Sequence, residues 1–340
     1  MNSCNNEYKV YFRGGFYGKQ KWERAGEEIP VNKTFTWGED TWLIPAVYSC
    51  SAGLVMDMCM RIEAKRMADY IQKLEPYREQ EELLTDEIQD KLQCANPLHQ
   101  DFDVRLQING KEVLERTGYG ESWIPEACLP EGESNSSKAK AFLEHYDLDL
   151  TCAWVIRRMS FPWPSRRRME IHELDLMLIQ HKTDFSGIHF TAPAIGESLT
   201  FTHPLTGAWH TLTVQALENS ELDTTHFGQE DMIYPNHYIQ MEFTVEPNLT
   251  RSELSVRDCS GSDQPRKKVT EEGFGPHATS SIGIIGGADG PTAILLAGKS
   301  SGPERHLAIS SLHFEPAQAV EWRMIFHKKM KEDIRIKIQL

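Results

Sequence analysis

The segment of residues 238–245 alternates apolar and polar side chains, and this period of two constrains the fold more than any other feature. Ile239, Met241, Phe243 and Val245 fall on one face of an extended chain, and the residues between them fall on the other. An amphipathic helix would instead place apolar residues three and four positions apart. The segment therefore predicts a strand in an antiparallel sheet with one face in water.

Similar alternation recurs elsewhere and predicts a chain dominated by β-strands. It is found in residues 8–12, 199–214 and 334–340. The spacing of apolar residues changes to three and four in residues 63–93, which predicts helix there, and we also expect a helix over residues 316–330. Short strands separated by turns favour a sandwich or barrel over a parallel sheet. We predict an α+β protein, β-dominated, with antiparallel sandwich or barrel-like sheets and a few helices.

Breaks in these patterns divide the chain into four expected parts. Residues 1–97 combine N-terminal strands with the helical segment, and residues 98–262 form an antiparallel β-rich domain. The polar stretch 263–275 is the expected linker. Residues 276–340 form a C-terminal segment with a glycine-rich hairpin, which we expect to pack on the N-terminal sheet.

The charge balance limits the classes of partner. The chain has 50 acidic and 36 basic residues, for a formal net charge of -14. Such a chain repels phosphate backbones and anionic lipids, so we expect neither nucleic acid nor membrane as partner. Its seven cysteines form no CxxC pair, and its first residues show no basic start followed by an apolar run. The cysteine spacing is typical of reduced thiols, and the first residues do not resemble a secretory signal. We therefore expect a soluble cytoplasmic protein.

Residues 281–298 are an unusual glycine-rich segment, SIGIIGGADGPTAILLAG. Two apolar runs flank Gly286, Gly287, Asp289 and Gly290. Asp-Gly-Pro is typical of a turn, so one interpretation is a buried hairpin whose glycines let two backbones pack closely. The other is a small-cation site, because a carboxylate beside exposed backbone carbonyls can ligate Na+ or a divalent metal.

The same segment resembles the signature of the beta subunit of sodium-ion-translocating decarboxylases. The resemblance places Asp289 at the position of the family's ion-site aspartate, and Gly286, Gly287 and Gly290 match its glycines. It implies binding of sodium or of a carboxylate. It is confined to residues 281–298, and the rest of the chain does not resemble that membrane protein.

If Asp289 holds sodium, sodium should raise the thermal unfolding midpoint more than potassium does at equal ionic strength. The reason is that an ion bound only by the native state stabilises that state. Asp289→Asn should abolish the difference between the two salts. Thermal unfolding of both proteins in both salts measures it, and an identical response would remove the hypothesis.

Four histidines of the β-rich part are candidate metal ligands: His203, His210, His226 and His237. Strand ends can bring imidazoles together, and imidazole suits divalent transition metals. None of the four has HExxH spacing, and the alternative is that they are ordinary hydrogen-bonded histidines.

Cys259 has no local sequence signature of a catalytic nucleophile. Cys259 follows Asp258 and can be paired in principle with His210 or His237, but a small buried thiol is the usual role of an isolated cysteine.

Three function hypotheses follow from the sequence. The first, which we favour, is a non-catalytic binding or interaction protein with a protein or small molecule as partner, because no nucleophile, base and oxyanion donors are spelled out. The second is a metal-assisted, hydrolase-like enzyme that uses the histidines of the β-rich domain. The third is small-cation or carboxylate binding at the glycine-rich segment.

Overall fold

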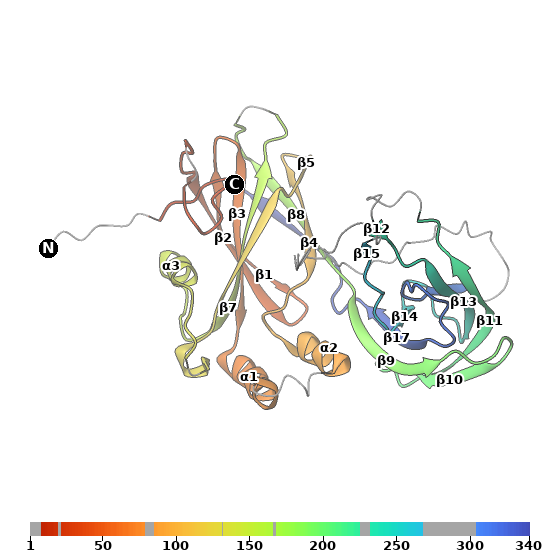
Figure 1. The fold of residues 1–340 in the computed structure, drawn as a ribbon. Coiled ribbons are helices and arrows are strands. Elements are labelled where there is room, and N and C mark those ends of the chain that lie inside the picture. The colour runs from red at the N-terminus through yellow and green to blue at the C-terminus, as the bar shows by residue number, and fades with distance from the viewer. Residues whose placement is uncertain are drawn as a thin grey trace, which may run out of the picture. The chain divides into compact units, whose positions relative to one another are not determined.

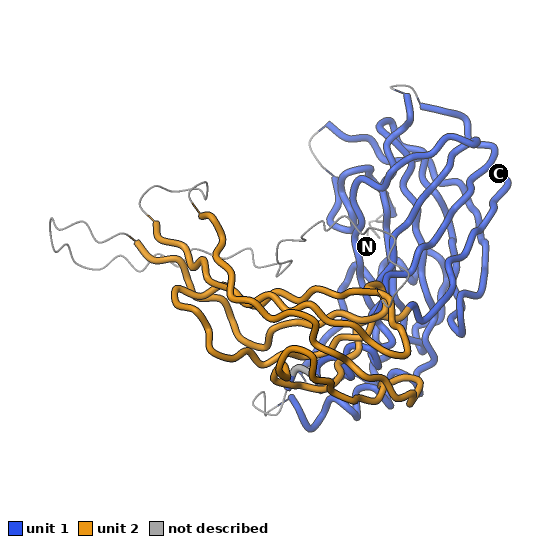
Figure 2. The backbone as a smooth tube through the Cα atoms, turned by 90° about the vertical axis from the view of Figure 1, so that its right-hand side faces the viewer, with its two compact units in different colours: residues 1–183, 329–340 blue, residues 184–328 orange. Residues whose placement is uncertain are grey.

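The chain folds into two compact units (Figure 2). Unit 1 comprises residues 1–183 and 329–340, and unit 2 comprises residues 184–328. The boundary at residue 183 falls inside residues 98–262, which we expected to be one β-rich domain. The computed structural model describes residues 8–19, 22–78, 85–130, 132–165, 168–224, 232–267 and 304–340.

Unit 1 contains two antiparallel sheets (Figure 1). The order of the first is β1-β2-β3-β7-β6, and the order of the second is β18-β8-β4-β5. The first consists of β1 (Glu27–Trp37), β2 (Asp40–Ser49), β3 (Gly53–Ile62), β7 (Ala153–Pro162) and β6 (Thr117–Trp123). The second consists of β18 (Ile334–Gln339), β8 (Glu173–Gln180), β4 (Phe102–Ile108) and β5 (Lys111–Leu114).

Both sheets of unit 1 contribute to one apolar core. Trp42 and Met58 come from the first sheet and Leu106 and Leu176 from the second, and all four are fully buried in the same cluster. Two sheets that share a core in this way form a β-sandwich. The C-terminal strand belongs to it, since β18 pairs with β8 and buries Ile336 in that core.

In the part of the chain that the structure describes, three α-helices and one short 3₁₀ helix accompany these sheets. They are α1 (Ala64–Arg78), α2 (Asp86–Ala95), η2 (Glu126–Cys128) and α3 (Ser137–His145). The helices α1 and α2 account for the helical segment predicted over residues 63–93. The hydroxyl of Ser136 accepts a hydrogen bond from the backbone N–H of Lys138 and so caps α3. Phe142 of α3 packs with Cys59 and Trp154, so α3 covers the outer face of the first sheet.

The strand predicted over residues 8–12 is wrong. These residues form irregular structure and a turn. Val10 and Phe12 are nevertheless buried, because they pack on Tyr48 and Val55 of the first sheet. Their alternation therefore marks an apolar contact with a sheet and not membership of it.

Unit 2 is a second β-sandwich. Its sheets have the orders β10-β11-β13-β16 and β14-β17-β9, and a two-stranded ribbon pairs β12 with β15. The first sheet consists of β10 (Ser198–Thr202), β11 (Trp209–Glu221), β13 (His237–Glu246) and β16 (His306–Ile309). The second sheet consists of β14 (Leu254–Asp258), β17 (Glu321–Lys328) and β9 (Thr183–Thr191). The ribbon consists of β12 (Met232–Ile233) and β15 (Arg266–Lys267).

The core of unit 2 lies between its two sheets. Phe243 of β13 and Trp322 of β17 belong to one buried cluster. The strand predicted over residues 238–245 is confirmed, because β13 contains them and buries alternate residues. The helix predicted over residues 316–330 is wrong, because this segment contains β17. Trp322, Met324 and Phe326 of β17 belong to the core of unit 2, and Ile325 between them is buried as well.

The predicted fold class is confirmed: the protein is α+β and β-dominated, with antiparallel sheets. Within the residues that the structure describes, no helix combines the length and the apolar character needed to span a membrane.

Candidate functional sites

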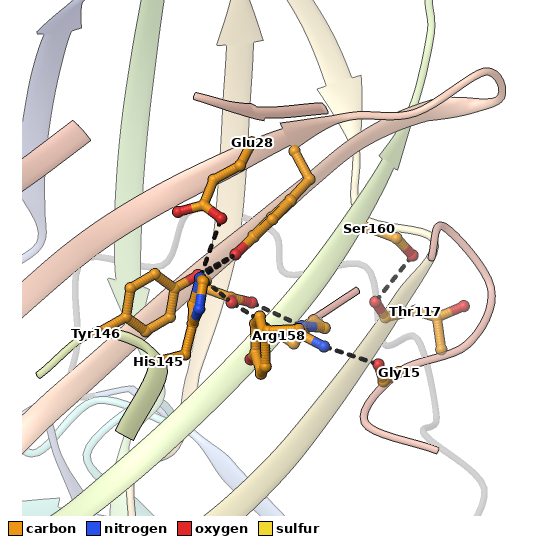
Figure 3. Close-up of polar contacts among 10 residues, drawn as sticks. Gly15, Glu28, Thr117, His145, Tyr146, Arg158 and Ser160 are labelled. Atoms are coloured by element: carbon orange, nitrogen blue, oxygen red, sulfur yellow. Dashed lines mark hydrogen bonds and ion pairs between the residues drawn. The ribbon is translucent and has the colours of Figure 1, made fainter. Parts of the chain in front are cut away.

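A buried ion pair lies at the centre of a polar network in unit 1 (Figure 3). Asp57 and Arg158 face each other on the neighbouring strands β3 and β7. Arg158 Nε and Nη2 donate to Asp57 Oδ1 and Oδ2, each at 2.7 Å. The Asp57 side chain is 0% exposed and the Arg158 side chain is 4% exposed, so the pair is shielded from water. The Asp57 carboxylate raises the pKa of Arg158 above its ordinary value although burial acts in the opposite direction, so the guanidinium stays charged.

Tyrosine hydroxyls supply further partners to both charges. Tyr146 donates to Asp57 Oδ2 at 2.7 Å, and Arg158 Nη2 donates to the Tyr8 hydroxyl at 2.6 Å. The hydroxyls of Tyr48 and Tyr146 are 2.5 Å apart. Burial, together with the nearby Asp57 carboxylate, raises the pKa values of all three tyrosines, which keeps them neutral.

The network reaches the surface at His145, the last residue of α3. His145 Nε2 lies 3.0 Å from Glu28 Oε2 (Figure 3). It also lies 3.4 Å from the Tyr48 hydroxyl, and the His145 ring stacks on Tyr8 at a distance of 4.0 Å between ring centroids. The network thus joins α3 and the N-terminal segment to the first sheet. Since Asp57 exposes no atom to solvent, we assign the network to stability and not to chemistry.

Two of the predicted metal-ligating histidines lie close together. The rings of His203 and His210 are 6.1 Å apart. Each nevertheless binds backbone: His210 Nδ1 donates to the Pro247 carbonyl at 2.8 Å, and His203 Nδ1 accepts from the N–H of Leu205 at 3.1 Å. Burial and the neighbouring His210 lower the pKa of His203, so it is neutral at pH 7.

The third histidine, His237, lies far from these two. It begins β13, whereas His210 lies beside the opposite end of that strand, where Thr211 pairs with Glu246. Nine residues of strand span about 30 Å. His237 Nδ1 lies 3.5 Å from Glu221 instead. The three histidines therefore do not gather in one site, and His226 lies outside the described residues.

The glycine-rich segment also lies outside the described residues. Gly286, Gly287, Asp289 and Gly290 thus remain a sequence-based prediction of a hairpin or a cation site.

A different group of ligand-type side chains gathers at one end of the sheet β14-β17-β9 in unit 2. Cys259 directly follows β14, Glu321 begins β17, and His189 lies near the end of β9. The Cys259 N–H donates to the Glu321 carbonyl at 2.9 Å, which fixes these two residues side by side. His189 Nδ1 lies 3.5 Å from Cys259 Sγ and 3.1 Å from Glu321 Oε1. All three ligand atoms lie within 4.8 Å of one another.

These distances match those between ligands of one metal ion. In a tetrahedral zinc site with bonds of about 2.1 Å to nitrogen and about 2.3 Å to sulfur, the two ligand atoms are about 3.5 Å apart. His189 and Cys259 already have this separation. All three residues are exposed, so a metal ion and a fourth ligand from solvent can reach them. The cluster fits three positions of a four-coordinate site.

Sequence reasoning included Cys259 only as a nucleophile and missed His189 and Glu321. The only local signal was a cysteine after an alternating segment. Cys259 and His189 are 70 residues apart, so no ligand-spacing motif exists to be found.

Comparison with known proteins identifies no relative: no family model, curated protein or solved structure matches this chain.

Proposed function

We propose that this protein binds a divalent transition-metal ion, with zinc as the best fit, through His189, Cys259 and Glu321. The observation that carries the proposal is the meeting of three ligand atoms from three neighbouring strands within 4.8 Å. A thiolate and an imidazole favour zinc or a similar ion over calcium and magnesium, which prefer oxygen ligands.

This proposal names a metal ion as the ligand of the non-catalytic binding protein that we favoured from the sequence. It also moves the alternative of metal-assisted hydrolysis from the four predicted histidines to this cluster. Three protein ligands leave the fourth position of a tetrahedral ion for water or for a ligand atom of a partner. Water in that position would be activated by the metal, whereas a partner's side chain would make the ion a bridge.

Cobalt(II) should report the site directly when it is added to reduced, untagged protein. We expect one equivalent to give the visible bands of a tetrahedral ion and a thiolate charge-transfer band in the near ultraviolet. Cys259→Ser should remove the charge-transfer band. His189→Asn and Glu321→Gln should each weaken binding by at least about tenfold, because each removes one of three coordinate bonds. Titration followed by absorption spectroscopy measures all of these effects.

The matched control is Cys94→Ser, which changes an exposed cysteine in α2 of unit 1. It should leave the cobalt spectrum and affinity unchanged, and zinc should displace cobalt from both proteins. Substoichiometric cobalt binding by the unsubstituted protein, or an unchanged spectrum in Cys259→Ser, would show that the cluster is not the metal site.

A further inference from the structure

A second polar cluster occupies the other end of the sheet β14-β17-β9. Ser255 lies at the start of β14, His327 near the end of β17, and Asp184 at the start of β9. Ser255 Oγ lies 2.8 Å from His327 Nε2, and His327 Nδ1 lies 2.6 Å from Asp184 Oδ1. The strands β17 and β9 each supply one residue to this cluster and one to the proposed metal site, whereas β14 supplies Ser255 and is followed by Cys259. The two clusters share no residue.

The strands hold this array from both sides. His327 donates its backbone N–H to the Glu253 carbonyl at 2.8 Å, which places its side chain diagonally across from Ser255. Arg257 Nη2 lies 3.1 Å from Asp184 Oδ2, so the guanidinium engages one carboxylate oxygen while the other faces His327.

The carboxylate determines which nitrogen of His327 carries the proton. An ionised Asp184 only accepts hydrogen bonds, so neutral His327 places its proton on Nδ1. Nε2 is then left to accept the proton of Ser255. The side chain of His327 is 15% exposed and Ser255 is half-buried, so the array is shielded but not closed.

We propose that Ser255 is a nucleophile that cleaves carboxylic esters, with His327 as its general base and Asp184 as a positioning residue. A catalytic triad of serine, histidine and carboxylate is recognised by the geometry of its contacts and not by the positions of its residues in the sequence. Ser255 lies within strand β14 and not at the strand-to-helix turn of a GxSxG motif.

The reaction balances with ester and water alone. Ser255 Oγ forms a bond to the ester carbonyl carbon while its proton passes to His327 Nε2. The bond between that carbon and the alkoxide oxygen then breaks, and the alkoxide takes the proton from Nε2 and leaves as the alcohol. Water next attacks the acyl-serine with the same histidine as base, which releases the carboxylic acid and restores Ser255.

A fluorophosphonate probe and p-nitrophenyl acetate test the proposal on the full chain. We expect one probe adduct per chain, mapped to Ser255, and no adduct in Ser255→Ala. His327→Gln should slow both labelling and ester hydrolysis by about a hundredfold or more, because a general base contributes that much. The control Ser198→Ala alters a serine that is exposed on β10, and it should behave like the unsubstituted protein.

The positioning role of Asp184 is tested by partial rescue. Asp184→Asn should slow turnover with little change in KM, and Asp184→Glu should recover part of the lost rate. The thermal unfolding midpoints of the two variants should agree, although their turnover differs. If Asp184 had a purely structural role, turnover and the unfolding midpoint would change together. Equal turnover of the two variants would remove this role.

Several outcomes would overturn the proposal: no labelling of the folded protein, an adduct on another residue, or unchanged ester hydrolysis in Ser255→Ala. These outcomes are independent of the test of the metal proposal. Cys259→Ser should keep its fluorophosphonate labelling, and Ser255→Ala should keep its cobalt spectrum.

Discussion

Asp57→Ala is expected to lower the free energy of unfolding of unit 1 by about 3–5 kcal/mol, because it leaves the buried Arg158 guanidinium without its counter-ion. Arg158 is only 4% exposed, so water cannot replace the lost carboxylate. The substitution also removes the acceptor of the Tyr146 hydroxyl. Urea unfolding measures the loss, and hydrogen exchange followed by mass spectrometry should locate it in β3, β7 and α3.

A double substitution separates the free-energy cost of losing the ion pair from the cost of losing the volume of its side chains. Asp57→Leu with Arg158→Met should cost less than the sum of the two single changes, because an apolar pair leaves no buried charge. The control Glu144→Ala breaks the exposed ion pair with Lys140 in α3 and should change stability little. Additive losses in the double variant would show that the two charges do not depend on each other.

Trp322→Ala is expected to destabilise unit 2 by about 3–5 kcal/mol, the usual cost of removing a large aromatic side chain from a packed core. Trp322 is 1% exposed and lies between the two sheets of this sandwich. Urea unfolding gives the magnitude, and the loss of hydrogen-exchange protection should centre on β13, β14 and β17.

The matched control is Trp209→Ala, which removes the same side chain from a site that is 69% exposed on β11. It should change stability by less than about 0.5 kcal/mol. Equal losses in the two variants would contradict the placement of the core. Since Trp322 follows Glu321 and pairs with Asp258 beside Cys259, Trp322→Ala should also weaken cobalt binding.

The Asp57–Arg158 network and the cluster of His189, Cys259 and Glu321 differ in what they offer to solvent. In unit 1, the Asp57 carboxylate is buried and saturated by Arg158 and Tyr146. In unit 2, His189, Cys259 and Glu321 are exposed. Burial also raises the pKa of the Cys50 thiol in unit 1 to about 12, which keeps it protonated at pH 7. The chemistry that we propose therefore lies in unit 2.

The sequence by itself determined local geometry. Period-two alternation identified β13 and β18, and the change of spacing identified α1 and α2, because alternation follows from which face of an extended or helical segment is apolar. Where two patterns competed the prediction was wrong: residues 316–330 were expected as helix, although Trp322, Met324 and Phe326 have a period of two in β17.

Only the tertiary structure decided which strands are partners. Backbone hydrogen bonds in a sheet are alike for every side chain, so alternation reports a strand's buried face and not its neighbour. The pairing of β18 with β8 and the sheet β14-β17-β9 were therefore not determined by local pattern. That sheet brings Cys259 to His189 across 70 residues and Ser255 to His327 across 72, so both proposed sites exist only once the strands have paired.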